Sequence, residues 1–228
     1  MPNNQQYDSA AAWRREQGER AVTRNQGEKN MSKSYLIRSV AGEPDWDLIP
    51  LLHVDQILWK PDCGVRAYGQ FCRDSESLCV HLCAIEADIR AEYTAPLSPV
   101  CQDSCLEFFF MPEKETRYFN FEINPNGCLW IGFGHSREDS TVLYRSGMEQ
   151  LFDIRTGRTR DGWEVFYRIP LSFLRLFLPD FAFAGILRAN VYKCGDLTAH
   201  EHYLSWNPIT SETPDFHRPE YFDRIVFV

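Results

Sequence analysis

The sequence predicts an all-β fold, an antiparallel β-sandwich of the jelly-roll or immunoglobulin-like type with one short helix. Short stretches in which polar and apolar residues alternate follow one another along most of the chain. Turn residues separate these stretches, and only residues 170–178 carry a helix-like pattern. Because the strands do not alternate with helices, the pattern favours packed antiparallel sheets over a parallel α/β fold.

The chain is organised as one domain preceded by a polar extension. Residues 1–30 contain no sustained apolar period, which predicts a flexible N-terminal extension. Met31 begins an apolar, alternating segment, so we expect a single folded domain over residues 31–228 and consider Met31 a candidate native start. After a first strand at 31–40, the expected strands are residues 65–71, 77–85, 104–112, 117–127, 127–134, 150–157, 162–170, 185–194 and 224–228.

Two segments punctuate these strands. The Pro-Asn-Gly sequence at 125–127 predicts a hairpin turn. The segment SETPDFHRPEYF, residues 211–222, contains two prolines, which argue against a continuous strand. Its three aromatic rings are unusual for a disordered segment, so we expect a rigid loop docked on the domain.

Composition and charge narrow the class of protein. Of the 228 residues, 44% are hydrophobic and 25% are charged, which is typical of a globular protein. The formal net charge of −8 argues against nucleic acid and anionic membranes as partners. The first residues lack the apolar stretch of a signal peptide, which predicts a cytoplasmic protein. The eight cysteines form no Cys-x-x-Cys pair, so we expect reduced, buried thiols, with disulfides as the alternative.

Period-two alternation identifies a polar sheet face. Four expected strands, 65–71, 104–112, 117–127 and 185–194, place apolar side chains on one face and polar or aromatic ones on the other. The second set is Arg66, Tyr68, Gln70, Glu107, Phe109, Asn120, Glu122, Asn124, Arg188, Asn190 and Tyr192. Such groups hydrogen-bond hydroxyls and stack on sugar rings, so on one shared sheet they predict a sugar or polyol site. A solvated face with cross-strand ion pairs is the alternative.

Five segments carry a resemblance to a known family: VCQDSCLEFFFMP, RYFNFEINPNG, YKCGD, SWNPI and TPDFHRPEYF. Together they resemble the family 9-like carbohydrate-binding modules, within the DOMON-like β-sandwich superfamily, over roughly residues 35–228. The resemblance implies non-catalytic binding of a mono- or oligosaccharide. It also implies structural calcium, whose ligands the sequence does not identify.

The resemblance further implies which residues bind sugar. In the family an aromatic clamp holds the sugar above a polar strand face, and the ring in the C-terminal loop corresponds to Phe216. A strand glutamate of the family corresponds to Glu107. The complete expected set of ligand-binding residues is Tyr68, Glu107, Asn120, Glu122, Arg188, Asn190, Trp206, Phe216, His217 and Arg218. The chain departs from the family at the second clamp ring, where Tyr93 is the nearest substitute, and at a strand arginine near Glu122.

Other functions compete with sugar binding. The fold could serve as an interaction or scaffold domain that has lost the sugar site. Glu107 and Glu122 would be the carboxylates of a glycosidase. A metal site would use Cys194, His200, His202 and His217.

Some DOMON-like domains bind haem through Met and His, but no such axial pair is evident in this sequence.

The tryptophans divide between two environments. Trp130 and Trp206 are expected at or near the core, and Trp59 is a candidate for a loop rim.

Overall fold

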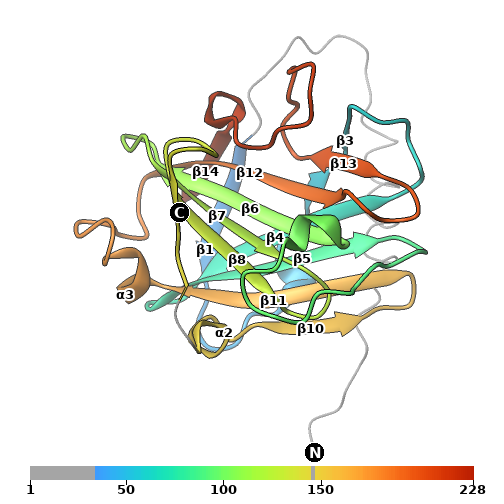
Figure 1. Cartoon of the computed structure of the whole chain (residues 1–228). Helices are drawn as coiled ribbons and strands as arrows, with labels where there is room; N and C mark the ends of the chain where they lie inside the picture. Colours follow the sequence, from blue (N-terminus) through green and yellow to red (C-terminus); the bar gives the residue numbers. More distant parts are fainter. Residues whose placement is uncertain (1–33, 145–146) are drawn as a thin grey trace, which may run out of the picture.

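The computed structural model describes residues 34–144 and 147–228, which form a β-rich fold (Figure 1). The expected extension at 1–30 and the expected start at Met31 lie outside the described residues. The strands are β1 (Ser34–Ser39), β2 (Leu52–Val54), β3 (Gln56–Leu58), β4 (Arg66–Arg73), β5 (Ser77–Ile85), β6 (Cys105–Pro112), β7 (Tyr118–Ile123), β8 (Leu129–Gly134), β9 (Ser140–Val142), β10 (Arg155–Arg158), β11 (Gly162–Pro170), β12 (Ile186–Gly195), β13 (His202–Ser205) and β14 (Asp223–Phe227). The helices are α2 (Met148–Leu151) and α3 (Leu171–Leu174), with 3-10 turns η1 (Trp46–Leu48), η2 (Val100–Gln102) and η3 (Pro219–Tyr221).

The all-β prediction is confirmed, with two differences in detail. The sheet is mixed, because β1 pairs parallel with both β14 and β4. Two short helices are described where one was expected, since α2 takes the beginning of the expected strand at 150–157 and only β10 follows it. The remaining expected strands occur within a few residues of their expected bounds.

The strands follow one hydrogen-bonded order, β10-β11-β5-β4-β1-β14-β12-β6-β7-β8-β9, which has β1 near its middle. Strands on the two sides of β1 share a core: the Phe71 ring of β4 lies 4.8 Å from the Phe108 ring of β6. The core cluster draws buried side chains from β4, β5 and β11 on one side and from β6, β7 and β12 on the other. The sheet therefore curls over this apolar centre, and each half keeps an outer face (Figure 1).

The outer face of β6, β7 and β12 follows the expected alternation. Phe108, Phe121 and Val191 belong to the main core, while their neighbours on the other face do not. A second cluster of buried side chains lies on that outer face and includes Phe109 and Tyr192. The hairpin between β7 and β8 is also confirmed, because Gly127 has a φ of 78° in the left-handed region.

The segment at 211–222 covers this second cluster as a docked loop, which confirms the expectation. Phe216 lies parallel to Tyr192 with ring centroids 4.1 Å apart, and the Tyr192 hydroxyl donates to the Phe216 carbonyl at 3.2 Å. The Arg188 guanidinium donates to the Pro219 carbonyl at 2.7 Å. Ring stacking and side-chain hydrogen bonds to the loop carbonyls together hold the loop in one position.

All eight cysteines are free thiols in the structure, and six of them are buried. Among the described residues, no helix has both the length and the apolar character needed to cross a membrane.

Candidate ligand-binding site

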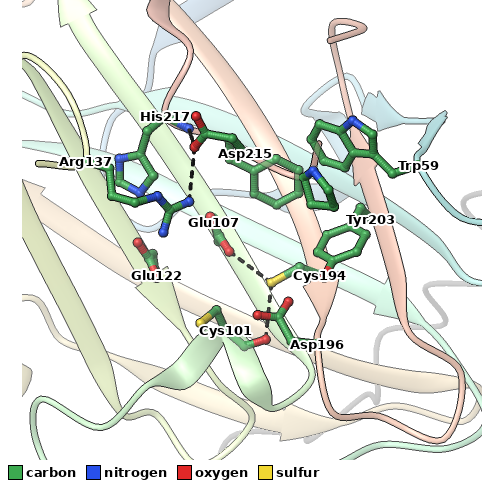
Figure 2. Close-up of a pocket in the computed structure, with 12 residues that line it drawn as sticks. Trp59, Cys101, Glu107, Glu122, Arg137, Cys194, Asp196, Tyr203, Asp215 and His217 are labelled. Atoms are coloured by element: carbon green, nitrogen blue, oxygen red, sulfur yellow. Dashed lines mark hydrogen bonds and ion pairs between the residues drawn. The ribbon is translucent and has the colours of Figure 1, made fainter. Parts of the chain in front are cut away.

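A groove lies on the outer face of β6, β7 and β12, beneath the docked loop (Figure 2). Its volume is about 220 Å³. Its lining residues are Trp59, Cys101, Glu107, Glu122, Arg137, Cys194, Asp196, Tyr203, Pro214, Asp215, Phe216 and His217. We call this hollow the groove.

Two glutamates form the floor of the groove. Glu107 on β6 and Glu122 on β7 are directly opposite each other in the antiparallel ladder. Both side chains are buried. The Glu107 carboxylate accepts from the Cys194 thiol at 3.0 Å, and the Glu122 carboxylate accepts from the Asn120 amide at 2.9 Å. Strand pairing therefore brings two acceptor groups together at the base of a concave site.

Aromatic rings form one wall. Trp59, which follows β3, and Tyr203 on β13 are partly exposed, and their rings are 5.5 Å apart in an edge-to-face arrangement. The Trp59 indole N–H donates to the Ser211 carbonyl at 2.7 Å, which fixes the ring against the loop. Phe216 lies behind them, 5.7 Å from the Trp59 ring.

Arg137 and Asp215 form the opposite rim. Arg137 comes from the turn between β8 and β9, and its guanidinium pairs with Asp215 at 3.1 Å. Asp215 also accepts from the His217 backbone N–H at 3.0 Å and pairs with Arg218. This ion pair ties the rim to the docked loop.

The groove holds more acid than base. Burial and the charge of Glu122 raise the pKa of Glu107 well above its usual value, and burial raises the pKa of Glu122 to about 7. Burial likewise raises the pKa of Asp196 and lowers that of His217 to about 4, so the imidazole is neutral at pH 7. Near neutral pH the floor therefore offers protonated as well as ionised carboxyl groups, that is, hydrogen-bond donors and acceptors.

A second hollow of about 200 Å³ adjoins the groove and shares Cys101, Glu122, Arg137 and His217 with it. Asn120 lines this hollow. The Asn120 Oδ1 atom is buried without a hydrogen-bond partner, although its amide nitrogen donates to Glu122. A buried acceptor without a partner lowers the stability of the fold unless a ligand or a water molecule donates a hydrogen bond to it.

The structure brings five expected site residues together and leaves five elsewhere. Glu107, Glu122, Phe216 and His217 line the groove, and Asn120 lines the adjoining hollow. Phe216 is only 7% exposed, however, and most of its surface packs within the second cluster. It therefore supports the wall from behind and presents little ring surface to a ligand.

The other five expected residues line neither hollow. Tyr68 is fully buried on β4, which belongs to the other half of the sheet, so the assumption that all four polar strands share one face is wrong. Trp206 belongs to the main core, which agrees with the expectation that it lies at or near the core and not with its place in the expected ligand-binding set. Arg188 donates a hydrogen bond to the Pro219 carbonyl, and Asn190 donates one to the Asn207 carbonyl. Arg218 pairs with Asp215 outside the groove.

Several lining residues were not expected from the sequence. Arg137, Asp196 and Asp215 come from turns and loops, where no periodic pattern marks a residue that faces a ligand. Tyr203 lies on the four-residue strand β13, which is too short to show an alternation. Trp59, already a candidate for a loop rim, is confirmed in that position, whereas Tyr93 donates to the Gln102 side chain and does not line the groove.

The proposed histidine metal site does not form. His202 Nε2 lies 2.7 Å from Lys193 Nζ, and His217 Nδ1 lies 2.7 Å from the Tyr118 hydroxyl. Each imidazole therefore faces a different partner.

The glycosidase arrangement is also not favoured. Glu107 and Glu122 lie side by side on one floor, whereas glycosidase carboxylates flank the bond that they cleave.

A β-rich domain with a concave, polar and aromatic site on one sheet face has the architecture of a ligand-binding module. The sequence profile of carbohydrate-binding family 9 matches residues 45–227. The chain belongs to this family.

Solved structures show the same fold. A candidate carbohydrate-binding protein from Bacteroides uniformis is similar with 26% identity and a TM-score of 0.76, over 87% of this chain and 100% of that chain. A family 9 carbohydrate-binding module from Caldicellulosiruptor kristjanssonii in complex with cellotriose is similar with 13% identity and a TM-score of 0.60, over 86% and 93% of the two chains. A family 9 module from the same organism in complex with glucose has 16% identity and a TM-score of 0.60, over 86% and 96%. The search among curated proteins returned no match.

Proposed function

We propose that the groove binds one ring of a carbohydrate, as a free monosaccharide or as the end unit of an oligosaccharide, without catalysing a reaction. The observation that carries the proposal is the opposition of paired carboxyl groups, Glu107 and Glu122, to a wall that contains Trp59 and Tyr203. Carboxyl groups exchange hydrogen bonds with sugar hydroxyls, and aromatic rings pack against the C–H faces of a pyranose.

The dimensions of the site favour a small ligand. Its volume of about 220 Å³ lies below the roughly 300–1,000 Å³ of sites for drug-sized molecules. The adjoining hollow leaves space for a substituent or a second unit near Asn120 and Arg137. The modules of the same fold that are complexed with glucose and cellotriose support this size class.

Calorimetric titration of a sugar panel that includes glucose and short glucans, with and without calcium, tests the proposal. The calcium arm addresses the structural calcium that the family resemblance implies and that stays a prediction. We expect Trp59→Ala to weaken binding by roughly 1–3 kcal/mol, the scale for loss of a central aromatic anchor. Glu107→Ala should also weaken binding, because it removes a carboxyl group that exchanges hydrogen bonds with sugar hydroxyls.

Trp46→Ala is the matched control. Trp46 is also a partly exposed tryptophan, but it packs against His81 and Phe166 on the other half of the sheet. Equal losses in the Trp46 and Trp59 variants would reject the groove as the binding site. If no sugar in the panel binds, the alternative of a scaffold domain that has lost its sugar site replaces the proposal.

A further inference from the structure

A pair of cysteines beside Glu107 forms a second chemical feature at the base of the groove. Cys105 on β6 and Cys194 on β12 are directly opposite each other in the antiparallel ladder. The Cys194 Sγ atom lies 3.0 Å from Glu107 Oε1 (Figure 2). One ligand-type atom from each of Cys105, Glu107 and Cys194 lies within 4.8 Å of the other two, and no other trio of this kind occurs within 34–144 and 147–228.

Among the described residues, no lysine or arginine forms an ion pair with this trio. All three side chains are buried, with Glu107 the most exposed at 3%. The basic side chains nearby have other partners: Arg137 pairs with Asp215 at 3.1 Å, and Lys193 pairs with Glu86 at 3.2 Å. A bound divalent cation would supply the positive charge that these three side chains lack and would displace the thiol protons.

A second cysteine pair shows the contrast. Cys72 and Cys79 are opposite each other on β4 and β5 and are equally buried. There, the Arg168 guanidinium lies 3.4 Å from Cys79 Sγ and 2.6 Å from the nearby Asp74 carboxylate. A resident arginine already supplies the positive charge, which makes this pair a natural control.

We propose that Cys105, Glu107 and Cys194 bind one divalent cation that prefers thiolate ligands, of the zinc class. Two thiolates and one carboxylate suit a borderline-soft ion such as zinc, and are unlike the all-oxygen sites of calcium. Zinc–ligand distances of about 2.0–2.3 Å in tetrahedral geometry require ligand atoms roughly 3.5–4 Å apart. The three ligand atoms already lie within 4.8 Å of one another, and the Cys194 Sγ–Glu107 Oε1 distance of 3.0 Å needs to open by only about 0.5 Å.

The fourth coordination position faces the groove. Glu107 and Cys194 both line the groove, together with Cys101 and Asp196. Either of these two side chains, water or a ligand hydroxyl is therefore close to the open position. A metal with three protein ligands and one open position would lie at the base of the sugar site.

Titration of the reduced, metal-free protein with Co²⁺, followed by displacement with Zn²⁺, tests this proposal without any sugar. We expect one Co²⁺ per chain, with the intense visible bands of tetrahedral cobalt and near-ultraviolet thiolate-to-metal absorption, and displacement by one Zn²⁺. Cys105→Ser and Cys194→Ser should each weaken zinc binding by more than the ~10–100-fold typical of losing an outer-shell partner. Glu107→Gln should weaken zinc binding while it keeps both thiols.

Two variants control for other thiols. Cys79→Ser alters the buried pair beside Arg168, and Cys63→Ser removes the exposed thiol. Both should bind zinc as the unchanged protein does. Melting curves recorded with and without zinc guard against misfolding, since zinc should raise the melting temperature only where the site is intact.

The proposal is overturned if the thiolate–cobalt absorption persists in both Cys105→Ser and Cys194→Ser, or if it disappears in Cys63→Ser. It is also overturned if rapidly alkylated, freshly purified protein contains a Cys105–Cys194 disulfide, because an oxidised pair offers no thiolates. Since metal alone is the probe, a failure here leaves the sugar-binding proposal untouched.

Discussion

Replacing Phe216 with alanine separates a structural role of the docked loop from a role in ligand contact. Phe216 is 7% exposed, stacks on Tyr192 at 4.1 Å and contacts the rings of Trp59 and Tyr203. Truncation of a buried phenylalanine costs about 3–5 kcal/mol of unfolding free energy. For a domain of this size, each kcal/mol lowers the melting temperature by about 2–4 °C, so we expect a loss of about 6–20 °C.

The assay is thermal or urea denaturation of Phe216→Ala beside Phe216→Leu, with sugar titration of both at a temperature at which each is folded. Phe216→Leu keeps much of the apolar volume and should lose less stability than Phe216→Ala. Sugar affinity should fall less in Phe216→Ala than in Trp59→Ala, whose ring is more exposed to the groove. A Phe216→Ala protein that melts within about 2 °C of the unchanged protein but loses sugar binding would refute this reasoning and restore Phe216 as a clamp ring.

Three further predictions concern acidity and packing. Burial raises the pKa of Glu122 from 4.5 to about 7, so the unfolded state loses this proton first and stability falls as pH rises from about 4.5 to 7. Over that range Glu122→Gln should gain stability relative to the unchanged protein in melting curves. Burial and Lys193 lower the pKa of His202 to about 4, so the unfolded state takes up the proton first and stability falls as pH drops from about 6.5 to 4. In His202→Gln the urea concentration at the unfolding midpoint should depend less on pH over this range. A Cβ added at Gly132 would collide with the Asn120 side chain, so Gly132→Ala should lower the free energy of unfolding by about 1–3 kcal/mol and weaken sugar binding. At Gly157 an added Cβ would have no contact closer than 3.7 Å, so Gly157→Ala should change neither stability nor sugar binding.

Alternation of side chains predicted much of the floor of the groove. On β6 and β7 the two-residue period correctly assigned Phe108 and Phe121 to the core and Glu107 and Glu122 to the opposite face. These are local properties, because neighbouring residues on one strand decide them. The same rule could not say which strands pair, and for that reason Tyr68 on β4 was assigned to a face to which it does not belong.

The rim of the groove required information that is not local. Arg137 and Asp215 are 78 residues apart and meet only because β8 and the docked loop lie at the same end of the groove. The short strands β2, β3, β9 and β13 contain three or four residues each, too few for a period to be visible. The docked loop was predicted from its prolines and rings, but composition alone could not separate a ring that supports a wall from one that contacts ligand.

The position of β14 has a consequence for how the chain acquires its fold during synthesis. Residues 223–227, the most C-terminal strand of the described fold, lie between β1 and β12, and Figure 1 shows the dark red β14 beside the blue β1. Until those residues leave the ribosome, β1 has no partner on one side and β12 has an open edge near Ile186–Ala189. Strands that wait with unpaired backbone groups are sites of mispairing between nascent chains. The sheet is therefore completed only once residues 223–227 have been made and have entered between β1 and β12.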